Sequence, residues 1–125
     1  METTTKFSVS LVGESTGKPY SGDFVVKTVL TRRDAFIADE RRRLVIGSNA
    51  ESVPPGLNSE AFVLGQLMVR IVESPTWWRD SDGGLNMEDL NVTMELFKLA
   101  MEKEEERITA LKKDSEKAVK ELTKK

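Results

Sequence analysis

The sequence predicts an α+β fold, in which an N-terminal β-hairpin packs on a small helical body with a long C-terminal amphipathic, coiled-coil-like helix. Three observations lead to this prediction. Apolar and polar residues alternate in the first thirty residues, with the period of two that is typical of half-buried strands. Two later segments carry helix caps and helical apolar spacing. In the last third, apolar residues recur in alternating steps of four and three, the heptad pattern of coiled coils.

Residues 6–30 are expected to form the hairpin. The apolar side of the first strand begins at Phe7, and the apolar side of the second strand includes Phe24 and Val26. Between them, residues 13–19 (GESTGKP) supply the Gly and Pro residues that are typical of turns. Two strands alone are marginally stable in water, so the hairpin is expected to pack against the helical body.

The first helix is expected over residues 31–47. Thr31 and Asp34 have the spacing of an N-terminal capping box, and Gly47 is a typical left-handed C-terminal cap. The predicted apolar stripe of this helix consists of Phe36, Ile37 and Leu44.

The second helix is expected over residues 59–74, after a loop at residues 48–58 and before Pro75. Its apolar side chains cover most of the helix circumference, and only Gln66 and Arg70 share a polar strip. A helix that is apolar nearly all round is normally buried, so it is predicted to be the central helix of the body. The residues expected to be buried include Phe62, Leu67 and Ile71.

The third helix is expected to start at residue 87, with Asn86 and Asp89 as its capping box, and to continue without Gly or Pro. Eight of its ten heptad positions are apolar, and the other two are Glu104 and Ser115. These ten positions are Leu90, Met94, Phe97, Met101, Glu104, Ile108, Leu111, Ser115, Ala118 and Leu122.

The chain is expected to divide near residue 101. Of the 25 residues from Met101 onward, 15 are charged, which is too many for full burial. We therefore expect a charged extension over 102–125 and a compact body over 1–101, made of the hairpin, the two helices and the start of the third helix at 87–101.

Composition argues against an enzyme. The chain has 125 residues, a net charge of −2, no cysteine and no histidine, so thiol chemistry, disulfides and the commonest general base and metal ligand are excluded. No catalytic residues, cofactor or metal are therefore expected. Apolar runs are all shorter than the roughly 20 residues of a membrane helix, so no membrane association is expected.

Two sequence features resemble a calcium site and a nucleic-acid-binding site, but their details argue against both functions. Asp80, Asp82 and Gly83 invite comparison with a calcium loop, but the glycine and the glutamate of an EF-hand are missing at loop positions 6 and 12. A turn before the last helix is the preferred interpretation. Five arginines between residues 31 and 47 scatter around the helix, with acidic residues between them, so nucleic-acid binding is disfavoured and an Asp39–Arg43 pair is expected.

Two groups of residues are candidates for binding a protein partner. The first is Trp77, Trp78 and Arg79, because Trp and Arg are enriched at interface hot spots; the alternative is that both tryptophans only pack in the body. The second group continues the heptad pattern beyond the body, where it pairs with a partner helix or frays. It consists of Ile108, Leu111, Ala118 and Leu122.

Several stretches together resemble small proteins of the tail module of long-tailed bacteriophages, chiefly the tail assembly chaperones. They lie in order between residues 20 and 105. These stretches are 22–26 (GDFVV), 39–44 (DERRRL), 75–78 (PTWW), 83–85 (GGL) and 89–92 (DLNV).

The resemblance implies a non-enzymatic role in the cytoplasm of the bacterial host. Such chaperones coat the tape-measure protein, keep its apolar helices soluble and recruit tail-tube subunits. They are typically helical, so the N-terminal hairpin is a departure that leaves room for a structural virion subunit, such as a tail-completion or head–tail joining protein. A nucleic-acid-associated regulator using the arginine-rich helix is a further alternative. Weak homo-oligomers are also expected through the interrupted heptad pattern.

Overall fold

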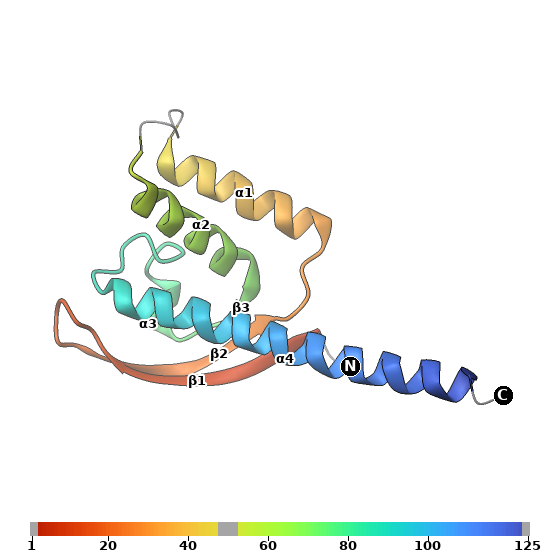
Figure 1. The fold of residues 1–125 in the computed structure, drawn as a ribbon. Coiled ribbons are helices and arrows are strands. Elements are labelled where there is room, and N and C mark those ends of the chain that lie inside the picture. Colours follow the sequence, from red (N-terminus) through yellow and green to blue (C-terminus); the bar gives the residue numbers. More distant parts are fainter. Residues whose placement is uncertain (1–2, 48–52, 124–125) are drawn as a thin grey trace.

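The computed structural model describes residues 3–47 and 53–123 and confirms the α+β class. The three-stranded sheet forms one layer, α4 crosses over it, and α1 and α2 pair above them (Figure 1). The C-terminal part of α4 extends past the rest of the chain. In chain order the elements are β1 (Thr4–Val12), β2 (Pro19–Lys27), α1 (Arg32–Ile46), α2 (Pro55–Arg70), β3 (Ile71–Glu73), α3 (Thr76–Arg79) and α4 (Leu90–Thr123).

The sheet has the order β1-β2-β3, with both strand pairs antiparallel. In the hairpin Phe7 lies opposite Phe24, and both side chains are buried. The strands alternate between a buried face toward the helices and a polar outer face, as predicted. The hairpin at residues 6–30 is thus confirmed, although its strands run from Thr4 to Lys27.

The cap that begins α1 is formed as predicted. The Thr31 hydroxyl accepts a hydrogen bond from the Asp34 N–H (3.1 Å), and the Asp34 carboxylate accepts one from the Thr31 N–H (3.0 Å). The second bond, helped by the nearby Lys27 ammonium, holds the pKa of Asp34 below its ordinary value. At the other end Gly47 has a φ of +81°, but its ψ of −169° is extended, so the left-handed cap expected there is not formed.

The apolar stripe predicted for α1 is wrong. Phe36 is 69% exposed and Leu44 is 70% exposed, and Ile37 is 37% exposed. The helix instead contacts α2 through small residues, because Ala38 lies against Gly65. Close approach of two helix backbones excludes bulky side chains, so the bulky residues of α1 face outward.

Gly65→Ala is expected to destabilise the chain by about 1–3 kcal/mol, although alanine is the better helix former. A Cβ at this position would lie 2.3 Å from the carbonyl oxygen of Ala38, so α1 would have to move away from α2. The measurement is urea denaturation, with Gly56→Ala in the first turn of the same helix as the control. Apart from its chain neighbours and the backbone of its own helix, no atom of the described residues lies within 4 Å of a Cβ at Gly56. Equal stability of the two variants would contradict the close helix contact.

The second helix is shifted from its predicted position. It starts at Pro55 and ends at Arg70, which is four residues earlier at each end than the predicted 59–74. Pro54 and Pro55, expected in the loop, form the N-cap and the first helical position, where a missing N–H costs nothing. Residues 48–52 of the predicted loop lie outside the described residues.

The sequence analysis missed the third strand. Ile71–Glu73 pair with β2, Ile71 opposite Val26 and Glu73 opposite Val25, around an irregularity in the register. The predicted extension of the second helix to residue 74 was therefore wrong. The segment before Pro75 is extended, which is the conformation that a proline favours in the residue before it.

Burial of α2 is one-sided rather than complete. Leu67 is fully buried as predicted, whereas Ile71 is only partly buried because it belongs to β3. Phe62 is 48% exposed, so the prediction that it is buried was wrong. One side of α2 therefore remains open between α1 and α4.

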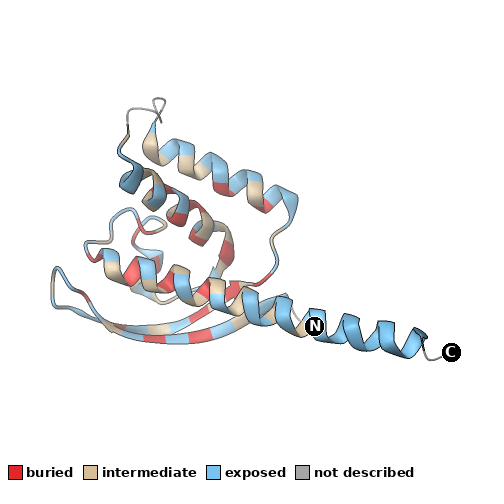
Figure 2. Cartoon of the chain, in the orientation of Figure 1, coloured by how far each residue is buried: buried red, intermediate tan, exposed pale blue. Residues whose placement is uncertain are grey.

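The core lies between the apolar face of the sheet, α2, α3 and the first part of α4 (Figure 2). Phe24 is completely buried and packs against the rings of Phe7, Trp77 and Trp78, with ring centroids 5.6, 5.6 and 6.4 Å away. The buried apolar residues of this cluster are Phe7, Val9, Tyr20, Phe24, Val26, Val63, Leu67, Trp78, Val92, Leu96 and Ala100.

A fully buried carboxylate, Asp89, joins the hairpin turn to the start of α4. It accepts hydrogen bonds from the N–H groups of Ser15 (2.8 Å) and Thr16 (3.0 Å), from the Thr16 hydroxyl (2.6 Å) and from the Tyr20 hydroxyl (2.7 Å). A Cβ at Gly13 would lie 2.2 Å from this carboxyl group, so only glycine fits beside it. The turn is thereby held on the helix start.

The start of α4 differs from the prediction. The helix begins at Leu90 rather than residue 87, because the Asp89 side chain binds the hairpin turn instead of capping the helix. The N–H of Asn86 donates to the carbonyl oxygen of Ser81, which places Asn86 in the preceding turn. The capping box predicted for Asn86 and Asp89 is therefore not formed.

Candidate protein-binding surface

The ten heptad positions of α4, eight of them apolar, form a line along the helix from Leu90 to Leu122, called here the α4 seam. Toward the C-terminal end of the helix, Ile108 and Leu111 are each 37% exposed and Leu122 is 71% exposed, and Ala118 is also exposed. Every described residue from Leu111 onward is exposed (Figure 2). The four heptad residues predicted to bind a partner therefore lie on one open helix face.

The part of the α4 seam over the body is also largely open. Leu90 and Met94 are exposed, and Phe97 and Met101 are partly buried. This half of the helix does pack on the body, but its heptad positions make only part of the contact. A different face makes the core contact, about 115° away around the helix at 100° per residue. That face consists of Val92, Thr93, Leu96 and Ala100.

The polar residue Glu104 of the seam has a partner within the body. Its carboxylate lies 3.3 Å from Nη2 of Arg70, which is only 4% exposed and also donates from Nε to Gln66 (3.1 Å). Nη1 of Arg70 is buried without a hydrogen-bond partner among the described residues. Glu104 therefore compensates a buried cation and holds α4 against the end of α2.

The helix stays close to the hairpin for several residues beyond Met101. Lys103, Arg107 and Ala110 line a shallow groove together with Thr4 and Thr28 at the ends of the hairpin strands. The freely projecting part of α4 therefore begins at Leu111.

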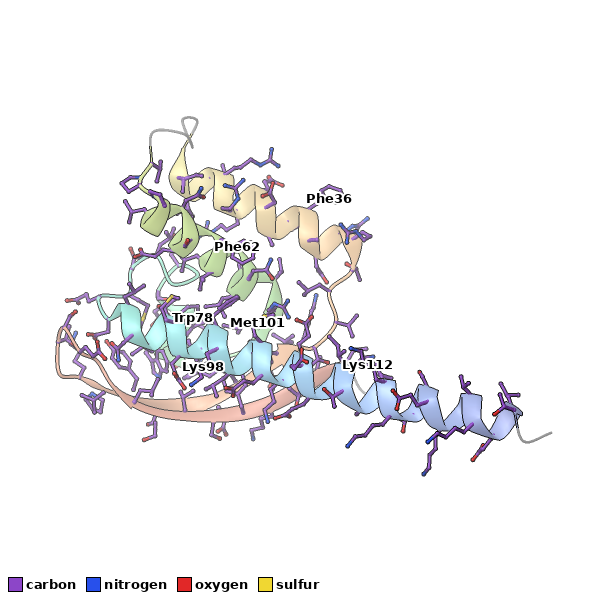
Figure 3. All side chains as sticks on the ribbon, viewed as in Figure 1. Phe36, Phe62, Trp78, Lys98, Met101 and Lys112 are labelled. Carbon is purple, nitrogen blue, oxygen red and sulfur yellow. The ribbon has the colours of Figure 1, made fainter. Side chains whose placement is uncertain are left out.

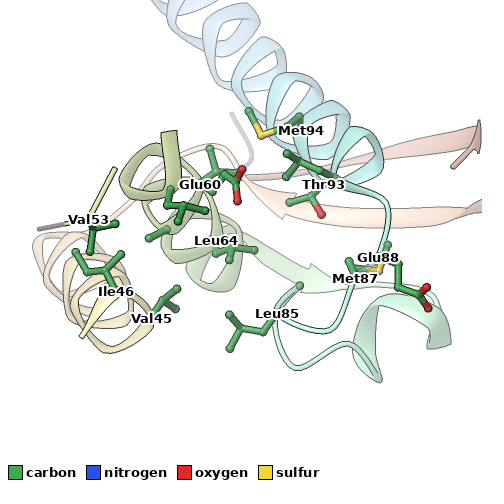
Figure 4. A pocket seen from close by; sticks show the side chains of 15 residues that line it. Val45, Ile46, Val53, Glu60, Leu64, Leu85, Met87, Glu88, Thr93 and Met94 are labelled. Atoms are coloured by element: carbon green, nitrogen blue, oxygen red, sulfur yellow. The ribbon is translucent and has the colours of Figure 1, made fainter. Parts of the chain in front are cut away.

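At the opposite end of α4, an apolar groove opens between the helices (Figure 4). It has a volume of about 400 Å³ and is formed by the end of α1, the start of α2, the 84–88 loop and the start of α4. Its charged lining residues are Glu60 and Glu88, with no basic side chain among the lining residues. Its exposed apolar residues are Leu57, Leu85, Leu90 and Met94.

The tryptophan pair packs within the body. Trp78 is 4% exposed, so it is a core residue, which agrees with the alternative that the tryptophans pack in the body. Trp77 is partly buried between the rings of Tyr20 and Phe24, and its Nε1 donates to the carbonyl oxygen of Ser21 (3.0 Å). Of this predicted group only Arg79 is exposed, and it donates to the Thr76 hydroxyl.

The arginine-rich helix α1 is partly neutralised by ion pairs. Asp39 binds Arg43 (3.2 Å), as predicted, and also Arg42 (3.0 Å). Arg41 donates to the carbonyl oxygen of Asp82 (3.0 Å) and pairs with its carboxylate (3.4 Å). These three arginine side chains are therefore paired with acidic residues of the same chain, and the Arg41 contact links the turn before α4 to α1.

The acidic turn at residues 80–84 has tight left-handed geometry. Asp82, Gly83 and Gly84 have φ values of +53°, +63° and +95°. Within residues 3–47 and 53–123, no cluster of three or more acidic side chains is placed to hold a metal ion. None of the helices in these ranges has the length and hydropathy that a membrane crossing requires.

Sequence reasoning located the projecting seam but missed the groove and the Arg70–Glu104 pair. The groove combines four segments that are distant in sequence, so no local pattern indicates it. Comparisons of the chain with protein-family models, curated proteins and solved structures find no match.

Proposed function

We propose that this protein is a non-enzymatic assembly factor that binds partner proteins through the projecting part of the α4 seam. The observation that carries the proposal is the exposure of the mostly apolar heptad positions from Leu111 to Leu122, on the part of α4 that extends past the body. An apolar line on an amphipathic helix is typical of a surface that pairs with another helix. The resemblance to tail assembly chaperones supplies the setting, which is tail morphogenesis of a long-tailed phage in the host cytoplasm.

The tape-measure protein and the tail-tube protein are the proposed partners. A tape-measure protein presents long apolar helices, and such helices match a seam that offers leucine and isoleucine with charged residues around it. Ser115 and Ala118 give the seam small side chains at two positions, so its affinity for a partner helix is moderate and its binding is reversible. An assembly factor that holds a client protein and later releases it requires reversible binding.

A structural virion subunit is the second candidate, and the sheet edge favours it. Strand β1 is nine residues long and pairs only with β2 among the described strands, so its other edge is available for strand addition. Lys6 and Asp23, which pair across the outer face of the hairpin (3.2 Å), place charges beside this edge and reduce its tendency to pair. The α4 seam therefore supports the stronger proposal.

Truncation after Ala110 is expected to abolish partner binding while leaving the body folded. This position keeps Glu104 for Arg70 and the stretch up to Ala110 beside the hairpin. The double variant Leu111→Asp/Leu122→Asp is expected to lower partner affinity at least tenfold, because each change places a charge in an apolar contact. The measurement is a pull-down, followed by titration, with the tape-measure and tail-tube proteins of the same phage.

The matched control for this experiment is Lys113→Asp/Lys120→Asp, with the same number of aspartates on the outward face of the same helix segment. Thermal melts of all variants check the body. Full partner binding by the truncated, folded chain would overturn the proposal and direct attention to the β1 edge or to the groove beside α2.

A further inference from the structure

We infer that the α4 seam also fits a second copy of this chain, placed antiparallel. In this arrangement the projecting end of α4 from Leu111 onward, called here the tail of the helix, lies across the body of the other copy. The open residues over the body and the open residues of the tail belong to one continuous face of a single unbroken helix. The helix has 34 residues and is about 50 Å long, so a tail cannot fold back onto its own groove. A second copy can cover both halves of the seam at once, which gives a closed twofold contact.

Size complementarity supports the antiparallel register. When the ten seam positions of two copies overlap fully, Leu90 faces Leu122 of the second copy and Met101 faces its Leu111. In the same register the two bulky residues of the body half, Met94 and Phe97, face the two small residues of the tail, Ala118 and Ser115. The pairing of large with small side chains in adjacent layers is what a well-packed helix interface requires.

Charge complementarity supports the same arrangement. Residues 111–125 contain six lysines and three acidic residues, a net charge of +3. The antiparallel register carries this basic segment to the groove of the second copy, whose charged lining residues are Glu60 and Glu88. Opposite charges therefore meet at both ends of the dimer, while Glu104 near its centre is already paired with Arg70.

The flanking positions of this register keep the dimer weak. They bring Lys98 near Lys112 of the second copy and Glu105 near its own equivalent, and Lys98 and Glu105 are both exposed. Figure 3 shows Lys98 and Met101 on the part of α4 over the body and Lys112 further along the helix. Like charges at exposed flanks cost little each, so the dimer forms at high concentration and exchanges readily for a client helix on the same seam.

The charge pattern gives a register-specific test. Lys98→Glu replaces two like-charge contacts by two attractions, each between the introduced carboxylate and Lys112 of the other copy, and is expected to tighten the dimer about two- to fivefold at low salt. Lys113→Glu, which changes charge equally on the outward face, is expected to weaken the dimer slightly rather than tighten it, because it lowers the net charge of residues 111–125 from +3 to +1. Sedimentation equilibrium of the full chain over a concentration series measures both. A chain that stays monomeric at several hundred micromolar, or equal effects of the two variants, would overturn the inference.

Disulfide cross-linking tests the relative orientation of the two helices. Because the sequence has no native cysteine, every disulfide that forms joins introduced residues. Leu90→Cys and Leu122→Cys are made separately, at positions exposed enough to keep the fold. The antiparallel dimer predicts a disulfide-linked species in the mixture of the two variants and little in either alone, with Lys113→Cys as the control. Efficient linkage of Leu122→Cys to itself would show a parallel pair. That result would overturn the antiparallel dimer without bearing on client binding.

Discussion

Phe24→Ala is expected to destabilise the chain by about 3–5 kcal/mol, the range for a buried phenylalanine. Phe24 is completely buried and contacts three other aromatic rings, from β1 and α3. The change removes apolar burial and leaves a cavity that Phe7, Trp77 and Trp78 cannot fill without moving together. Urea denaturation followed by tryptophan fluorescence measures the loss and reports directly on the neighbouring indoles.

The matched control for this prediction is Phe36→Ala on the outer face of α1, where the ring is 69% exposed (Figure 3). The same chemical change at the surface is expected to alter stability by less than about 0.5 kcal/mol. Similar losses for the two variants would show that Phe36 is covered in solution and that Phe24 is not the centre of the core.

Asp89→Asn is expected to lower stability at neutral pH and to flatten the dependence of stability on pH in acid. The hydrogen bond from the Thr16 hydroxyl, followed by those from Tyr20 and the turn N–H groups, outweighs burial and lowers the pKa of Asp89 from 3.8 to about 2. The charged carboxylate therefore stabilises the fold above about pH 4, and this contribution is lost as the pH falls toward 2. Equilibrium denaturation at a series of pH values from 7 to 2 measures the effect.

Asp80→Asn is the control for the acid experiment, because Asp80 is exposed in the neighbouring turn. It is expected to keep the steep acid loss of the parent chain. Asp89→Ala is expected to be more damaging than Asp89→Asn at pH 7, since it leaves the N–H groups of Ser15 and Thr16 without an acceptor. A parent-like pH profile for Asp89→Asn would show that Asp89 is not the acceptor in solution.

Local signals explain what could be predicted of the fold. The strand alternation around Phe7 and Phe24 and the capping box at Thr31 involve residues close in sequence, and both form as expected. The Ile71–Glu73 strand could not be separated from the helix before it, because β-branched residues after a helical run fit either structure until a partner strand is known. That partner, Val25 and Val26, lies more than forty residues earlier.

Which face of a helix is buried depended on partners that periodicity does not specify. In α1 the bulky Phe36 and Leu44 suggested the buried stripe, but a close approach to Gly65 selected the side with Ala38. In α4 the heptad pattern suggested the contact face, whereas Val92 and Ala100 make it. The open seam could be located from sequence, because its charged surroundings are local, but its ion pair between Arg70 and Glu104 spans 34 residues.

The hydrogen bonds of Asp89 impose an order on folding during synthesis. The hairpin strands pair across 23 residues at most, from Thr4 to Lys27, but the turn between them is separated from its acceptor by 74 residues at Ser15. At roughly 5–20 residues per second, about 4–15 s pass between the synthesis of the turn and that of Asp89. Throughout that interval the N–H groups of the turn are hydrated, and the hairpin can open and close. Arrival of Asp89 ends this period, so a turn made 74 residues before its acceptor becomes fixed only after that acceptor is synthesised.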